Sequence, residues 1–103
     1  MKVRQATLDD QATLLALVRE SFEKETEVSP DEWAKTEAAV KLLLQDPQAG
    51  EAQLMCDEHG AAIGYIIICR GFSLDQGGYF TWVEESYLRQ AEQRRFRDQR
   101  FPS

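Results

Sequence analysis

The run Tyr65-Ile66-Ile67-Ile68 constrains the fold of this chain more than any other feature. It lies inside a longer apolar segment, 61–70, whose β-branched residues predict a strand. The shorter segment 52–56 has the same character, and the turn-forming residues 57–60 lie between the two. Strands joined by so short a turn pair antiparallel. We therefore expect an antiparallel hairpin with His59 in its turn.

Two amphipathic helices are predicted before this hairpin. Thr7 and Asp10 form a Thr-x-x-acid capping signal, and apolar residues then recur at helical spacing through about Lys24. The second helix begins at 29–32, which combines an N-cap serine, a proline at the first helical position and a glutamate at the third. Pro47 stops this helix just before it.

Two further strands complete the predicted sheet. Residues 2–6 alternate polar and apolar side chains, and residues 79–88, after a loop predicted at 71–78, are rich in aromatic and β-branched side chains. Strict alternation along the last strand would point Glu84 and Glu85 to opposite faces, so that they could not act as a pair. The order is β-α-α-β-β-β, which is an α+β fold with a mainly antiparallel sheet, followed by a short C-terminal helix or tail.

Size and composition indicate a single domain over residues 1–103. Of these 103 residues, 43% are hydrophobic and 29% are charged, as in an ordinary folded protein. The sequence after Met1 lacks the apolar stretch of a signal peptide, and no window approaches the roughly 20 apolar residues that span a bilayer. We therefore expect a cytoplasmic protein with no membrane partner.

Charge is distributed unevenly along the chain. Residues 1–88, which hold the predicted sheet and helices, carry 7 Lys and Arg against 16 Asp and Glu, whereas the tail 89–103 carries 5 against 2. The acidic body argues against a nucleic-acid partner. The basic tail suits a phosphate ligand, an acidic partner or simply a solvated surface. Its residues 90–97 can begin a third helix, although their apolar content is low.

The cysteines and the histidine do not form a pattern typical of a metal site. Cys56 and Cys69 lack the spacing of a zinc site or a disulfide scaffold, and we expect both to be small buried hydrophobes. A single histidine gives no metal site and no hydrolase triad. Tyr79, Phe80 and Trp82 suit base stacking, but their strand pattern favours core packing.

Three segments resemble those of the GNAT superfamily of N-acetyltransferases. Residues 3–10 (VRQATLDD) are similar to the opening strand and helix cap of the family, and residues 62–65 (AIGY) to its third strand. Residues 84–89 (EESYLR) are similar to the Glu-Asp-Leu-Tyr-Val-Arg run of the fourth strand in the subgroup that acetylates polyamines and related small amines. The resemblance implies a truncated GNAT-like fold, the N-terminal half only, with acetyl-CoA as cofactor and a small amine as substrate.

The resemblance also implies roles for residues of the fourth strand. Glu84 aligns with the acidic residue that, in some members, removes a proton from the amine directly or through water. The alternative is that Glu84 is a solvent-facing carboxylate. Ser86, Tyr87 and Leu88 would offer backbone groups to the pantetheine arm of acetyl-CoA, although Tyr87 is equally suited to packing a sheet face.

Gln93, Arg94 and Arg95 fall where the family has its [Gln/Arg]-x-x-Gly-x-[Gly/Ala] pyrophosphate loop. Gln93 matches, but Phe96 and Asp98 occupy the positions of the two small residues. Backbone N–H groups must approach the diphosphate closely, which a side chain at these positions hinders. Asp98 also places a negative charge against a negative ligand. The loop is therefore degenerate.

Two functions remain open from the sequence. The chain derives from an acetyl-CoA-dependent N-acetyltransferase of small amines, but the degenerate loop and the absence of the family's later elements argue against catalysis by this chain alone. Alternatively, it is an inactive interaction module that forms a homodimer through the open edge of its fourth strand. A third interpretation is that a frameshift or an early stop ends the chain.

Overall fold

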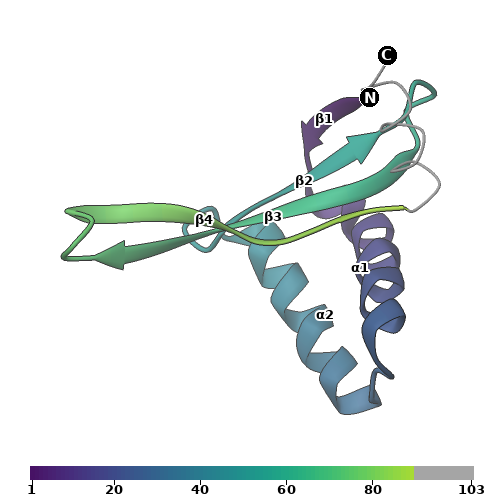
Figure 1. Cartoon of the computed structure of the whole chain (residues 1–103), viewed down its shortest axis with the longest axis horizontal. Coiled ribbons are helices and arrows are strands. Elements are labelled where there is room, and N and C mark those ends of the chain that lie inside the picture. The colour runs from purple at the N-terminus through teal and green to yellow at the C-terminus, as the bar shows by residue number, and fades with distance from the viewer. Residues whose placement is uncertain (90–103) are drawn as a thin grey trace, which may run out of the picture.

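The computed structural model describes residues 1–89 (Figure 1). The elements along the chain are β1 (Lys2–Gln5), the 3-10 turn η1 (Leu8–Asp10), α1 (Gln11–Glu25), α2 (Pro30–Gln45), β2 (Gly50–Cys56), β3 (Ala62–Ser73) and β4 (Gly78–Leu88). The predicted α+β order β-α-α-β-β-β is confirmed. The predicted helix at 90–97 and most of the basic tail lie outside the described residues.

The four strands form one antiparallel sheet in the order β1-β2-β3-β4. Each strand therefore pairs with its neighbour in sequence, and β4 is an outer strand of the sheet in the part of the chain that the structure describes. Both helices lie on the same side of this sheet (Figure 1). Neither helix within residues 1–89 is long and apolar enough to cross a membrane.

The start of α2 and the 3-10 turn η1 that precedes α1 have the side-chain hydrogen bonds that the sequence predicts. The Ser29 hydroxyl accepts a bond from the Glu32 N–H at 3.2 Å, ahead of the proline that begins α2. The Asp10 carboxylate accepts the Thr7 N–H at 2.9 Å and binds the Arg4 guanidinium through two bonds of 2.8 and 2.9 Å. The bond from Arg4 is the main reason that the pKa of Asp10 is lowered to about 2.

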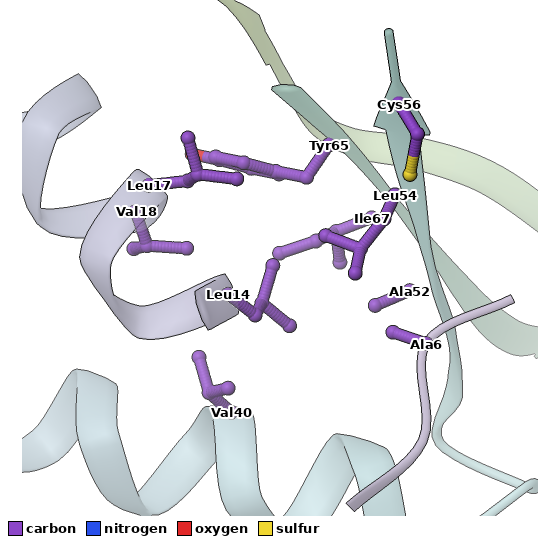
Figure 2. Close-up of a cluster of buried hydrophobic side chains, with 10 residues drawn as sticks. All are labelled: Ala6, Leu14, Leu17, Val18, Val40, Ala52, Leu54, Cys56, Tyr65 and Ile67. Atoms are coloured by element: carbon purple, nitrogen blue, oxygen red, sulfur yellow. The ribbon is translucent and has the colours of Figure 1, made fainter. Parts of the chain in front are cut away.

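The core lies between the helices and the sheet (Figure 2). Its largest fully buried side chains are Tyr65, Leu14, Leu17, Leu54 and Val18. In Figure 2, Leu14 of α1 lies between Val40 of α2 and the sheet, so that both helices share one core with the strands. The predicted apolar stripes of both helices therefore face the sheet.

The hairpin of β3 and β4 extends beyond the rest of the sheet as an arm, defined here as residues 70–81 (Figure 1). Gly50 of β2 pairs with Cys69, and beyond this point β3 pairs only with β4. The loop predicted at 71–78 is therefore wrong, since strand pairing continues as far as Ser73 opposite Gly78. Cross-strand contacts outweigh the local preference of this Gly- and Ser-containing segment for a loop.

Candidate functional site

A β-bulge in β4 decides which side chains face the helices. Ile67 pairs with Glu85 whereas the next residue, Ile68, pairs with Val83, so Glu84 is the extra residue in β4. Directly paired residues of antiparallel strands share a face, and one extra residue shifts the alternation by one position. The predicted strict alternation, with Glu84 and Glu85 on opposite faces, is therefore wrong.

A groove of about 500 Å³ opens between the two helices and the strands β3 and β4. Its apolar lining includes Val18, Phe22, Ala39, Val40, Leu43 and Ile67. Glu84 and Glu85 line this groove together, with Arg70 and Trp82. The bulge thus brings two adjacent acidic residues to one mostly apolar groove.

Glu84, the predicted catalytic base, lies at the exposed side of this groove. The Trp82 indole N–H donates a hydrogen bond of 2.7 Å to the Oε2 atom of Glu84. A charge-assisted bond of this kind fixes the direction of the carboxylate while leaving acceptor capacity on it. Glu84 is therefore a solvent-accessible carboxylate with a fixed orientation, and its place suits proton exchange with water.

Glu85 is half-buried and accepts a hydrogen bond from the Tyr65 hydroxyl. Tyr65 is fully buried, and burial, followed by the bond to Glu85, raises the pKa of its hydroxyl well above its usual range. Tyr65 therefore stays protonated and acts as a fixed donor to Glu85. Glu85 was not among the predicted site residues, because strict alternation placed it on the face opposite Glu84, whereas the bulge brings Glu84 to the face of Glu85.

Cys69 also lines the groove and is half-buried, whereas Cys56 is buried in the core. The expectation that both cysteines are buried hydrophobes is thus correct only for Cys56. Burial, and secondarily the charge of Glu84, raises the pKa of the Cys69 thiol. Because the thiolate is the reactive form, Cys69 acts in the groove as an apolar lining residue.

The end of β4 is tied to α1 by polar contacts. The Tyr87 hydroxyl donates a bond of 3.0 Å to Glu20, and the Arg89 guanidinium donates two bonds of 3.0 Å to the same carboxylate. The bond from Arg89 is the main reason that the pKa of Glu20 is lowered. The Tyr87 ring also lies 5.1 Å from the Lys24 ammonium. The side chain of Tyr87 therefore connects the sheet to the helix.

The three residues predicted to contact pantetheine through their backbone do not all direct that backbone to the same edge of β4. The Arg89 N–H donates to the Ile63 carbonyl at 3.1 Å, so the backbone of Arg89 is directed toward β3. In an antiparallel ladder this direction alternates, which also directs the backbone of Tyr87 toward β3. Ser86 and Leu88 lie at the alternate positions, on the outer edge. Ser86 thus has the orientation that such a contact needs, whereas Tyr87 does not.

The predicted pyrophosphate-loop residues Gln93, Arg94 and Arg95 lie outside the described residues. Among residues 1–89, no group of three or more His, Cys, Asp or Glu side chains is arranged to hold a metal ion. His59 lies in the turn between β2 and β3, where its backbone N–H donates a hydrogen bond of 2.8 Å to the Asp57 carboxylate. This is the turn position that the sequence predicts for it.

Several solved structures share this fold, whereas no protein-family model and no curated protein matches the chain. An integron cassette protein from the mobile metagenome of Cole Harbour Salt Marsh has a TM-score of 0.78 and 28% identity over 86% of this chain. A possible acetyltransferase from Clostridium difficile 630 has a TM-score of 0.72 and 20% identity over 87% of it. A ribosomal-protein-alanine N-acetyltransferase from Brucella melitensis biovar Abortus 2308 has a TM-score of 0.64 and 18% identity over 88% of it.

The fold of this chain is therefore a GNAT-like acetyltransferase fold, as the sequence resemblance predicts. The chain spans 57% to 59% of the length of these three structures. The likeness concerns the arrangement of helices and strands, while the resemblance to the polyamine subgroup stays a prediction.

Proposed function

We propose that this chain derives from an acetyl-CoA-dependent N-acetyltransferase and that its groove binds the amine of a small acceptor. The observation that carries the proposal is the position of Glu84 and Glu85 at one mostly apolar groove. An alkylammonium ion combines an apolar stem with one positive charge, so it matches apolar walls that end in carboxylates. The acidic body of the chain would further attract such a cation.

The two carboxylates would have different roles because their surroundings differ. Glu85 is half-buried and held by Tyr65, so it would pair with the ammonium group and fix its position. Glu84 is exposed and held by Trp82, so it would accept the proton that the amine must lose before it can attack an acyl group. Transfer of that proton from Glu84 to solvent would follow directly, or through one bound water.

Acetyl-CoA, when bound, supplies the acyl thioester that a neutral amine attacks. The outer edge of β4 at Ser86 fits the pantetheine arm, because amides of an extended chain can pair with a strand edge. Phe96 and Asp98 do not fit a diphosphate at the positions where the family has small residues. The proposal is therefore that this chain binds the amine but does not acetylate it by itself.

A second candidate function is self-association, which the outer position of β4 favours. No strand among residues 1–87 pairs with the outer edge of β4 as far as Ser86, and such an edge is a template for a strand of another chain. In this alternative two copies would pair along β4 and form a homodimer without catalysis. Ser86→Pro would remove an outward-directed N–H group and prevent such pairing.

Isothermal titration with n-hexylamine and, separately, with acetyl-CoA tests the first proposal. We expect saturable binding of the amine, at least about tenfold weaker binding for Glu85→Gln, and no heat with high-micromolar acetyl-CoA. Glu51→Gln is the matched control, because Glu51 pairs with Ile68 and so lies on the sheet face away from the groove. Amine binding that is absent, or equal in Glu85→Gln, would contradict amine binding in the groove, and acetyl-CoA binding would contradict the inferred misfit of its diphosphate.

A further inference from the structure

The arm carries large apolar side chains that are exposed among the described residues 1–89. Phe72 is 64% exposed, Leu74 is 88% exposed and Tyr79 is 72% exposed. Figure 1 shows the arm directed away from the helices and from β1. A two-stranded ribbon is marginally stable in water, and contiguous exposed apolar surface marks a site of interaction. The arm is therefore a candidate contact surface.

Each face of the arm carries one pair of aromatic side chains, and the two pairs differ in exposure. On the face toward the helices, the rings of Phe80 and Trp82 lie 5.4 Å apart over Gly71. On the opposite face, Phe72 and Tyr79 form an edge-to-face pair with ring centroids 5.4 Å apart. The opposite face therefore carries the more exposed aromatic pair.

A charged group completes this face. The Arg70 guanidinium lies 5.3 Å from the centroid of the Tyr79 ring. Arg70 also borders the groove, but since it pairs with Thr81 its side chain extends over the same face as Phe72 and Tyr79, two residues closer to the body of the protein. We call this surface, made by Arg70, Phe72 and Tyr79, the outer face of the arm.

The charges of the arm are arranged with opposite signs at its two ends. Arg70, near the body, and Asp75, in the turn, are the charged residues of 70–81, so the arm is neutral in a chain of net charge −6. A neutral arm lets two acidic chains approach each other with the least repulsion. Two arms lying antiparallel would bring Arg70 of each copy toward Asp75 of the other. Parallel arms would instead bring like charges together.

We propose that two copies of this chain associate through the outer faces of their arms, in an antiparallel arrangement about a twofold axis. The aromatic pair Phe72–Tyr79 of each copy lies at the axis, and Arg70 meets Asp75 of the second copy at both ends. Such a contact is isologous, with aromatic anchors at its centre and charges at its rim. It goes beyond the proposed amine binding, and it uses a different surface from strand pairing along β4. Because only a few residues of each copy take part, the buried area of this contact is small and the association should be weak.

Sedimentation velocity of the full chain, from about 10 µM to about 1 mM, tests this contact. We expect a monomer at the low end and a dimer at the high end. Phe72→Ser and Tyr79→Ser should each weaken the dimer at least about tenfold, because they remove an aromatic anchor. Leu8→Ser is the matched control, since Leu8 is 47% exposed on η1, and it should leave the dimer unchanged. Circular dichroism checks that each variant is folded.

A charge exchange tests the antiparallel arrangement without removing any apolar contact. Arg70→Asp and Asp75→Arg should each weaken the homodimer, whereas an equimolar mixture of the two variants should form a heterodimer as strong as the unaltered dimer or stronger. Both sites are exposed, so these variants keep the test valid if an aromatic substitution fails to fold. A monomer at every concentration, a dimer insensitive to Phe72→Ser, or no recovery in the mixture would overturn the proposal. Loss of the dimer in Ser86→Pro alone would assign it to the β4 edge instead.

Discussion

Trp82 and Glu85 project from the same face of β4, although residues three apart in a regular strand point to opposite faces. The extra residue between them, Glu84, makes this possible by interrupting the pairing of β4 with β3. The single extra residue Glu84 therefore adds a second carboxylate beside that of Glu85. Bulges of this kind re-aim side chains next to functional sites in many proteins.

Deletion of Glu84 should leave the fold intact and weaken amine binding. Without Glu84, Val83 and Glu85 can keep their partners Ile68 and Ile67 in one continuous ladder, so we expect an unfolding temperature equal to or above that of the unaltered chain. The affinity for n-hexylamine should fall several-fold, because one of the two carboxylates is gone. Thermal unfolding and calorimetric titration measure the two effects. An unfolded deletion variant would contradict the inferred register.

Tyr65→Phe should cost about 1 to 3 kcal/mol of unfolding free energy, because it removes the only hydroxyl that donates to Glu85 in the described residues. Tyr87→Phe is the matched variant, as its hydroxyl also donates to a carboxylate but at the end of the sheet. Only Tyr65→Phe should also change amine binding. Urea unfolding combined with amine titration separates them, and equal amine affinity in the two variants would count against a positioning role of Tyr65.

Gly64→Ala should destabilise the chain by about 1 to 3 kcal/mol, as overpacking does. A Cβ atom at this position would lie 2.3 Å from the Tyr87 carbonyl oxygen, which the strand pairing holds in place. Gly60→Ala is the control, because a Cβ atom there meets nothing within 4 Å and has only the strain of a φ of 83°. Denaturant unfolding should rank Gly64→Ala as the more damaging change, and the reverse order would contradict the close β3–β4 contact.

Acid should remove part of the stability through Asp10. Its pKa is lowered from 3.8 to about 2 in the folded chain, mainly by the hydrogen bond from Arg4. The stabilisation from this group is therefore present above pH 3.8 and is lost as the pH falls toward 2. Urea unfolding across this pH range should show a smaller acid loss for Asp10→Asn than for the unaltered chain. Parallel pH profiles of the two chains would rule out this contribution.

The helix starts could be predicted from the sequence because they depend on local hydrogen bonds. Ser29 caps α2 and Asp10 accepts the Thr7 N–H at the start of η1, each within three residues, so the signal is contained in a short window. The arm could not be predicted in this way. Its strands are held by contacts between Phe72 and Tyr79 across the hairpin, and the local sequence around Gly71 is equally suited to a loop.

Of the two acidic residues of the candidate site, Glu84 could be predicted from the sequence and Glu85 could not. Glu84 was identified through its resemblance to a family position, and the structure brings it to the groove. That Glu85 shares the groove with Glu84 could not be predicted, since a bulge depends on how β4 pairs with β3 and leaves no fixed mark in the sequence of one strand. The outward orientation of the Ser86 backbone follows from the same pairing of β4 with β3.

The central claim, that the groove binds a cationic amine through its two carboxylates, is tested most directly by an NMR titration of the isotope-labelled chain. We predict that n-hexylamine shifts the amide signals of Glu84, Glu85 and Cys69 in a saturable way. The neutral ligand n-hexanol has the same apolar stem but no positive charge. It should bind at least about tenfold more weakly, because it cannot form an ion pair with a carboxylate. Equal binding of the amine and the alcohol, or shifts that avoid these three residues, would contradict the claim.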